Sequence, residues 1–172
     1  MEHPTRPIAD AAALEQAVRQ YQAELLRYAA GILGNAADAE DAVQTAFLKL
    51  WHSRGRLRPD TNLRALLYRI TCNTALDMLR RARREAARTP PAAPPETDGP
   101  ETADRRAALR AALDALAPQD RALVWGQVVE GLSYRELAAI HHRPEPYLRN
   151  RCSRAKRLLA DLLTQMEEED CT

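Results

Sequence analysis

Apolar residues recur at helical spacing in the first part of the chain. In residues 14–33 they fall three or four positions apart, at Leu14, Val18, Tyr21, Leu25, Tyr28 and Ile32. This spacing places them on one face of a helix. Gly34 follows at a position that favours a left-handed cap, and Asn35 is a typical N-cap for a second helix that ends near Trp51.

A third helix is predicted beyond a short loop. Gly55 and Pro59 interrupt the helical periodicity after the second helix. Thr61 or Asn62 then caps a helix that continues to about Glu85. Its apolar positions are Leu63, Leu66, Leu67, Ile70, Leu76 and Leu79.

Residues 89–102 differ from the rest of the chain. They include Pro90, Pro91, Pro94, Pro95 and Pro100, which are five of the 11 prolines. This composition cannot bury a core and favours extended polyproline II structure. We therefore predict a flexible linker over residues 89–103. At roughly 3.1 Å per residue it would reach on the order of 40 Å, so two domains could occupy separate sites on one large partner.

Four shorter helices are predicted in the second half. Pro118 fits the first position of a helix, where its missing N–H costs nothing, and Gly131 ends that helix. Ser133 and Glu136 match the S-x-x-E capping box and open the next one. The expected ranges are 104–116, 118–130, 133 to about 141, and 144–146 to about 166.

The composition supports an all-α fold. Gly is scarce, at 6 residues, and no run of alternating β-branched residues predicts a strand. Hydrophobic residues make up 45% of the chain but aromatic residues only 5%, so the core must consist mainly of Leu, Ala, Val and Ile. We predict two small helical domains over residues 14–88 and 104–166, joined by the linker. A disordered N-terminus (1–13) and an acidic tail (167–172) would flank them.

The charged residues are unevenly distributed, although the formal net charge is only +1. Residues 54–88 hold ten arginines against three carboxylates, and residues 135–157 hold seven Lys or Arg against two. Two basic blocks separated by acidic material indicate two contacts with a polyanion. Solvated, Arg-rich helix faces are the alternative interpretation.

The sequence does not support a membrane segment, a metal site or a catalytic site. The three cysteines are widely spaced, and the chain has neither an apolar leader nor about 18 consecutive apolar residues. We expect a cytoplasmic protein with reduced thiols and no membrane insertion. His141, His142 and Cys152 lack metal-ligand spacing, so neither a metal nor another cofactor is expected. No phosphate loop, nucleophile elbow or catalytic carboxylate pair predicts an enzyme.

The second predicted helix carries an acidic and amide stripe beside an apolar face. Asp38, Glu40, Asp41 and Gln44 occupy two turns next to Val43, Phe47 and Leu50. This arrangement favours docking onto a basic partner helix. The alternative is that the acids only stabilise the N-terminal end of the helix dipole, by roughly 0.3–1 kcal/mol each. That alternative does not account for Gln44 or Phe47.

Two further segments have the residue types of nucleic-acid readers. Asn73 lies on the same helix as the run Arg80-Arg81-Ala82-Arg83-Arg84, and Asn and Arg are typical of base and phosphate contacts. The segment that begins Gly131-Leu132-Ser133 predicts a helix-turn-helix. Solvated polar surfaces are the alternative explanation for the first segment, and ordinary DNA-binding domains also contain the second motif.

The order of these parts resembles the extracytoplasmic-function (ECF) subfamily of bacterial sigma factors, of the sigma-70 type with regions 2 and 4. The string 38–51 resembles their polymerase-binding helix, and residues 68–73 resemble a typical L-Y-R-I-A-R-N run. The resemblance implies contacts with RNA polymerase core at Asp38, Glu40, Asp41, Gln44 and Leu48. It implies contacts with the minus-ten element at Arg56, Arg58, Asn62, Tyr68, Asn73, Arg80, Arg81 and Arg84. Contacts with the minus-thirty-five element are implied at Arg143, Tyr147, Arg149, Asn150, Arg154 and Lys156.

The chain departs from the family pattern in its DNA-reading segments. Leu63 and Leu66 stand where aromatic residues are common, and Cys72 replaces a usual Arg, so stacking would rely on Tyr68. In the helix-turn-helix, His142 replaces the usual Gly of the turn, where a Cβ is strained. Pro146 disfavours helical geometry at the preceding residue, so we expect the recognition helix to start one turn late.

The resemblance implies a transcription initiation factor that directs RNA polymerase core to specific promoters. It would recognise and melt the minus-ten element, bind the minus-thirty-five element, and be controlled by an anti-sigma factor that is often membrane-anchored. Two alternatives stay open on the residues alone. One is a conventional helix-turn-helix regulator that binds duplex DNA without acting as a sigma factor. The other is an interaction module, such as an anti-sigma decoy, whose arginine blocks would be idle.

Overall fold

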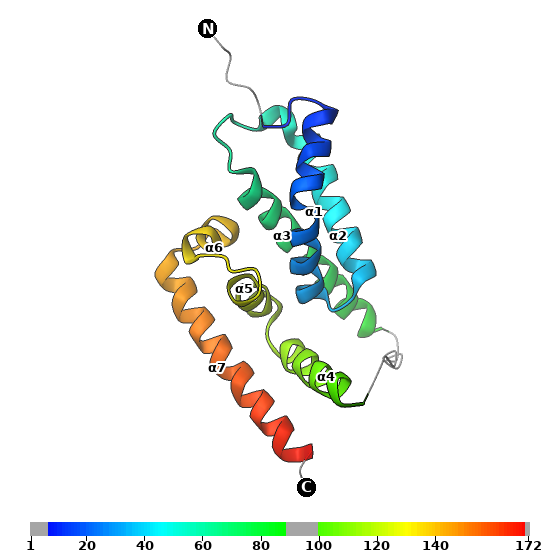
Figure 1. Cartoon of the computed structure of the whole chain (residues 1–172), viewed down its shortest axis with the longest axis vertical. Helices are drawn as coiled ribbons and strands as arrows, with labels where there is room; N and C mark the ends of the chain where they lie inside the picture. Colours follow the sequence, from blue (N-terminus) through cyan, green and yellow to red (C-terminus); the bar gives the residue numbers. More distant parts are fainter. Residues whose placement is uncertain (1–6, 89–99, 171–172) are drawn as a thin grey trace.

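The computed structural model describes residues 7–88 and 100–170, and within these ranges the fold is all-α, as predicted (Figure 1). The helices are α1 (Ala11–Leu33), α2 (Ala36–Ser53), α3 (Leu63–Ala86), α4 (Pro100–Ala115), α5 (Pro118–Val128), α6 (Tyr134–His141) and α7 (Glu145–Asp170). A short 3-10 turn, η1 (Arg54–Arg56), follows α2. The helices α1, α2 and α3 form one bundle, and α4 to α7 form a second domain against it.

Local capping explains where the helices of the first bundle begin. Asn35 accepts a hydrogen bond from the Asp38 backbone N–H at 2.8 Å, and Asn62 accepts one from Ala65 at 3.0 Å. Gly34 has a φ of 87°, which is the left-handed conformation that favours glycine. These three predictions from the sequence are confirmed.

The first residues that the structure describes are ordered, so the prediction of a disordered N-terminus was wrong for residues 7–13. Asp10 caps α1 by accepting the Ala13 N–H at 2.8 Å. Ile8 is buried in the core. The cap and this apolar anchor together fix the entry into the helix. Residues 1–6 of the predicted disordered segment lie outside the described residues.

The linker and the tail are shorter than expected. The helix α4 begins at Pro100, so residues 100–103 are helical, consistent with proline's preference for the first turn of a helix. The rest of the predicted linker, 89–99, lies outside the described residues. The backbone of α7 continues to Asp170, beyond the expected end near residue 166. Residues 171–172 of the predicted acidic tail are not described.

The helix-turn-helix forms from α6 and α7. The capping box is present, because Ser133 accepts the Glu136 N–H at 3.2 Å and Glu136 accepts the Ser133 N–H at 2.8 Å. His142 adopts the left-handed conformation expected of the turn, with φ 50°. The recognition helix starts at Glu145, within the expected start at residues 144–146, and the further prediction that Pro146 delays this start by one turn was wrong. Pro146 sits in the first turn, where an N–H has no intrahelical acceptor, and the Pro144 carbonyl accepts the Leu148 N–H at 3.1 Å.

One hydrophobic core passes through both domains. Tyr28 and Leu67 of the first bundle and Leu123 and Leu137 of the second domain belong to the same buried cluster. The contacts run between α1 and α5 and between α3 and α6. The two domains are therefore packed together, although the sequence predicts two separate units on a linker.

Candidate functional site

An apolar groove of about 480 Å³ lies between α1 and α2. Three residues predicted for polymerase binding, Glu40, Gln44 and Leu48, line it. They are spaced four residues apart, which puts them on one face of α2. Leu48 is 53% exposed, whereas its neighbours Phe47 and Leu50 are buried. The groove therefore presents apolar surface to solvent beside a carboxylate and an amide.

The other two predicted docking residues have different surroundings. Asp38 is exposed and takes part in the N-terminal cap of α2, since its carboxylate accepts a hydrogen bond from Asn35 Nδ2 at 2.8 Å. Asp41 is exposed on the next turn but does not line the groove. The structure thus brings together three of the five residues and gives Asp38 a local role.

The second wall of the groove comes from α1 and was missed by the sequence reasoning. It consists of Leu14, Val18, Gln22 and Leu26. Leu14 and Val18, which the apolar periodicity placed on one face of α1, are partly buried and pack at the edge of the core. The spacing of four residues along this wall is the signal that would have separated it from the buried stripe of Leu25, Tyr28 and Ile32.

The arginines predicted to contact the minus-ten element are exposed. Those on the loop after α2 and at the end of α3 are Arg56, Arg58, Arg80, Arg81 and Arg84. Asn73 is also exposed, and Asn62 caps α3. Arg80 additionally pairs with Asp77 at 2.7 Å. Arg80, Arg81 and Arg84 form an exposed basic carboxyl end of α3, suited to phosphate contacts. Arg56, Arg58 and Asn62 precede the amino end of the same 24-residue helix, so the structure does not bring the two groups together.

Tyr68 is not available for base stacking in this arrangement, contrary to the expectation from the sequence. Its ring is 0% exposed and lies 5.0 Å from the ring of Tyr28. Its hydroxyl donates a hydrogen bond to Glu24 at 3.1 Å. Burial, followed by the nearby Glu24 carboxylate, raises the pKa of Tyr68. Tyr68 is therefore a core residue between α1 and α3. The predicted apolar face of its helix did not include it.

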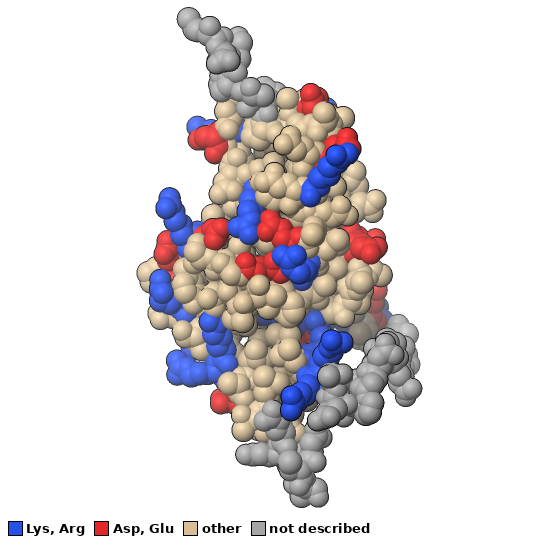
Figure 2. All heavy atoms as spheres, viewed as in Figure 1, with Lys and Arg blue, Asp and Glu red and all other residues tan. Residues whose placement is uncertain are grey.

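The turn before α7 and the exposed face of α7 carry most of the residues predicted for the minus-thirty-five element. Arg143, Tyr147, Arg149, Asn150 and Arg154 are all exposed. Arg149 lies over the ring of Tyr134 at 4.4 Å, and Arg143 lies 5.8 Å from the ring centre of Tyr147. Lys156 is half-buried and bonded to Gln127 of α5. Figure 2 shows Lys and Arg side chains gathered over α6 and α7.

The interface between the domains encloses a smaller cavity of about 200 Å³. Asn73 and Arg80 line it from α3, and Arg143 and Tyr147 line it from the helix-turn-helix. Residues predicted for two different DNA elements therefore face the same small space. His141 also lines this cavity, and its burial, together with nearby Arg151, lowers its pKa to about 4.

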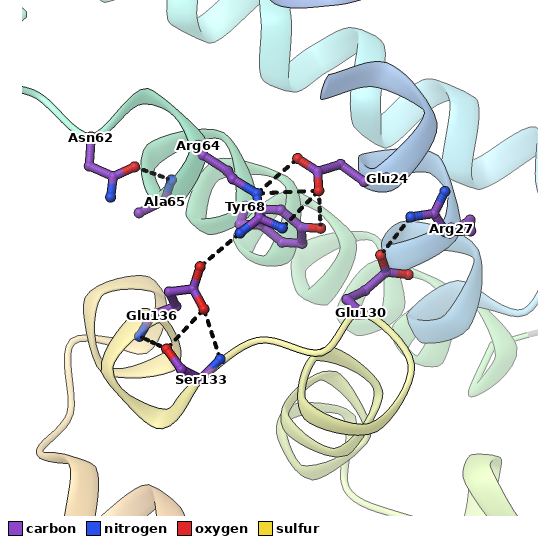
Figure 3. A network of polar contacts seen from close by, with 9 residues as sticks. All are labelled: Glu24, Arg27, Asn62, Arg64, Ala65, Tyr68, Glu130, Ser133 and Glu136. Atoms are coloured by element: carbon purple, nitrogen blue, oxygen red, sulfur yellow. Dashed lines mark hydrogen bonds and ion pairs between the residues drawn. The ribbon is translucent and has the colours of Figure 1, made fainter. Parts of the chain in front are cut away.

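A polar network connects the two domains beside this cavity (Figure 3). Arg64 of α3 donates to Glu24 of α1 at 2.8 Å and to Glu136 of α6 at 2.8 Å. Hydrogen bonding by the Ser133 backbone, and then the proximity of Arg64, lower the pKa of Glu136. Arg27 of α1 pairs with Glu130 at 3.1 Å. No cluster of three or more metal-ligating side chains occurs in the described part of the chain.

Two sequence-family models match this chain. The sigma-70 region 2 model matches residues 17–85, and the sigma-70 region 4 model matches residues 106–159. The first match contains the groove and the basic end of α3. The second contains most of the helix-turn-helix and its exposed basic face. Among the described helices, none is long and apolar enough to cross a bilayer.

Several curated proteins are similar over most of the chain. The ECF RNA polymerase sigma factor SigE of Mycolicibacterium smegmatis is 36% identical over 163 residues, covering 90% of this chain but only 63% of SigE. RNA polymerase sigma factor CarQ of Myxococcus xanthus is 33% identical, covering 91% of this chain and 92% of CarQ. ECF RNA polymerase sigma factor SigM of Mycobacterium tuberculosis is 34% identical, covering 90% and 79%.

Two solved structures share the fold over most of this chain. CnrH in complex with the cytosolic domain of CnrY aligns with a TM-score of 0.69 at 26% identity, covering 91% of this chain and 90% of that one. The sigma factor RpoE in complex with the anti-sigma factor NepR, from Bartonella quintana, shares the fold with a TM-score of 0.67 at 24% identity, covering 87% and 96%. From its two matched regions, its relatives and its fold, the chain belongs to the ECF group of the sigma-70 family.

Proposed function

We propose that the chain is a transcription initiation factor that binds RNA polymerase core and directs it to promoters. The observation that carries this proposal is the open groove beside the exposed stripe of α2, within the region-2 match. An exposed Leu48 next to Glu40 and Gln44 suits a partner helix with one apolar and one basic face. Burying the apolar part would stabilise the complex, and the polar part would orient it.

DNA reading is proposed for the two basic surfaces. The exposed face of α7 would enter the major groove of the minus-thirty-five duplex, where Arg and Asn can contact base edges. The carboxyl half of α3, with Asn73 and Arg80, would hold the unpaired minus-ten strand. Capturing single-stranded DNA stabilises the melted promoter without nucleotide hydrolysis, so all the chemistry would be performed by the polymerase. The chain would therefore act in the cytoplasm, beside the polymerase.

An anti-sigma factor is proposed as the regulator of this chain. CnrH is solved with the cytosolic domain of CnrY, and RpoE with the anti-sigma factor NepR. This chain aligns with both along most of its length, and with CnrH at 26% identity. A protein that covers the groove or the basic surfaces would block the proposed contacts.

Binding to sigma-free bacterial core polymerase on a sizing column tests the proposal. The wild-type chain is expected to co-elute in a stoichiometric complex. Leu48→Glu places a charge in the groove at an exposed position, and should weaken the complex by about 2 kcal/mol, roughly thirtyfold in Kd. Gln44→Ala should weaken it in the same direction. Gln20→Ala, an exposed change outside the groove on α1, is the matched control and should bind as wild type.

Two results would contradict this assignment. A wild-type chain that elutes alone would favour the conventional duplex-binding regulator. A Leu48→Glu variant that binds core as well as Gln20→Ala would leave the sigma-factor assignment in place but move the docking site away from the groove.

A further inference from the structure

The cavity of about 200 Å³ beside α3 is lined by cations and by neutral hydrogen-bond donors. Its lining arginines are Arg80, Arg143 and Arg151, and among the described residues no Asp or Glu lines it. Amide and hydroxyl groups are added by Asn73, Gln119 and Tyr147. A small space with donors on several walls and no carboxylate in its lining suits an anion.

The carboxylates near the cavity neutralise only part of its positive charge. Asp77 pairs with Arg80 at 2.7 Å, and Asp120 pairs with Nε of Arg151. Arg143 forms no ion pair within the part of the chain that the structure describes. One guanidinium charge at the cavity is therefore uncompensated, and an anion placed there would be attracted to it.

Arg151 leaves the donors of two neutral side chains unused. Its Nη1 donates to the Tyr147 hydroxyl oxygen at 3.0 Å, and its Nη2 donates to Gln119 Oε1 at 3.3 Å. Because both side chains act as acceptors in these bonds, the Tyr147 O–H and the Gln119 amide N–H groups remain free to donate. Arg151 thus holds in place two further donors that line the cavity.

A buried ring nitrogen at the same place lacks a hydrogen-bond partner. His141 lines the cavity, and its Nε2 is buried without a partner among the described residues. Buried polar atoms in native proteins are nearly always hydrogen-bonded. A polar ligand in the cavity would satisfy this nitrogen.

Two helices also begin at the cavity. Gln119 lies in the first turn of α5, which starts at Pro118, and Tyr147 lies in the first turn of α7, which starts at Glu145. The amino end of a helix carries partial positive charge. Both helix ends therefore add to the attraction for an anion that the arginines provide.

The volume of the cavity limits the size of the anion. About 200 Å³ is several times the roughly 30 Å³ that a water molecule occupies in the liquid, and it is below the roughly 300–1,000 Å³ of pockets for drug-sized ligands. A small polyatomic ion fits this space, whereas a nucleotide does not.

We propose that this cavity is a binding site for one free orthophosphate ion. Arg80 and Arg143 would hold its oxygens through charge-assisted hydrogen bonds, and Gln119 and Tyr147 would add neutral donors. A phosphate of the DNA backbone offers the same oxygens but carries a nucleoside on each side, which a space of this volume does not admit. The proposal goes beyond the proposed function and does not depend on polymerase binding.

The test titrates sodium phosphate into the full-length chain by calorimetry, with chloride holding the ionic strength constant. Wild type should bind one ion saturably, and its unfolding temperature should rise with phosphate concentration. Gln119→Glu retains the oxygen that accepts from Arg151 but replaces the amide donor by a carboxylate. It should weaken phosphate binding by at least about tenfold, because a hydrogen bond to the anion is lost and a like charge is gained.

The matched control is Gln127→Glu. Gln127 lies on the same helix and also accepts from a cation, Lys156, through its Oε1, but it does not line the cavity. The same change of charge there should leave phosphate affinity as in wild type. A second pair serves if Gln119→Glu loses helicity by circular dichroism: Arg143→Met should weaken binding, whereas Arg157→Met, at an exposed position of α7 outside the cavity, should not.

Three outcomes overturn the inference. One is a wild-type chain that shows neither saturable heat nor thermal stabilisation with phosphate. Another is equal weakening in the cavity variant and its control, which would mean that only overall charge matters. The third is a wild-type chain that does not bind orthophosphate but whose affinity for single-stranded DNA falls in Gln119→Glu, which would assign these donors to DNA alone. Binding of core polymerase, measured separately, reports on the proposed function and not on this site.

Discussion

Cys72 and His142 show how the surroundings of a side chain in the folded protein determine its role. Cys72, which replaces an arginine of the family pattern, is buried against Tyr28, and its burial raises its pKa to about 11. Its thiol therefore stays protonated at neutral pH, and the residue acts in packing. His142 accepts a left-handed backbone in the turn between α6 and α7 and contacts Arg69 of α3. Its side chain thus has a role in the interdomain contact that glycine would not have.

His141 makes stability dependent on pH at the same interface. Its pKa is lowered to about 4 in the folded chain, below the ordinary value of 6.5, so the unfolded chain binds more protons between these values. The contribution is fully present above about pH 6.5 and is lost as the pH falls towards 4. We expect the urea midpoint of wild type to fall more steeply than that of His141→Leu between pH 7 and pH 4.5. Parallel declines in the two proteins would contradict this.

At the scale of the helix, capping decides where α6 begins and how α7 is presented. The Ser133 hydroxyl accepts the Glu136 N–H and donates to its carboxylate at 2.9 Å. Only residues 142–144 separate α6 from α7, so the orientation of α7 relative to α6 has little freedom. The basic face of α7 is therefore positioned by elements that precede it.

Ser133→Ala should destabilise the chain by about 1 kcal/mol, because the N-cap acceptor of α6 is lost. The free energy of unfolding from urea titration measures this change. Ser133→Asp restores a side-chain acceptor and should recover most of the loss. Equal losses in the two variants would mean that the hydroxyl acts through another contact.

At the scale of the whole molecule, Arg121 links three segments. It is 3% exposed and donates to the carbonyls of Leu113 and Asp114 of its own domain as well as to Ile32 of α1. Its guanidinium pairs with Asp114 at 2.9 Å. A buried cation is tolerated here because it has acceptors on all sides.

Arg121→Met should lower the free energy of unfolding by about 3 kcal/mol, because three backbone carbonyls lose the hydrogen bonds that they accept from its guanidinium. It should also expand the chain in scattering, since one of those carbonyls belongs to the other domain. Arg106→Met, the same substitution at an exposed position of α4, is the control and should change neither quantity. Destabilisation without expansion would confine the role of Arg121 to the second domain.

Local patterns were sufficient to predict most elements of the fold. Helix periodicity, the caps at Asn35 and Asn62, and the capping box at Ser133 depend only on neighbours within one turn, so the sequence determines them. Family membership could also be predicted from the sequence, because the order of acidic helix, basic helix and helix-turn-helix can be recognised from the residues alone. The start of α1 was misjudged because its cap, Asp10, is a weak local signal that the burial of Ile8 supports. The delay expected from Pro146 in α7 is absent, and Leu148 in the first turns of that helix is buried.

Tertiary structure alone decided which helix faces meet. The groove needs α1 beside α2, and Tyr68 is buried because its ring packs against that of Tyr28. The ring of Trp125 from α5 occupies the space that a Cβ at Gly31 would need. The sequence predicts two domains on a linker, whereas packing joins them through a common core. The physical reason is that periodicity gives the apolar face of each helix but not the partner that covers it. Burial and the pairing of charges such as Arg64 and Glu136 choose that partner in three dimensions.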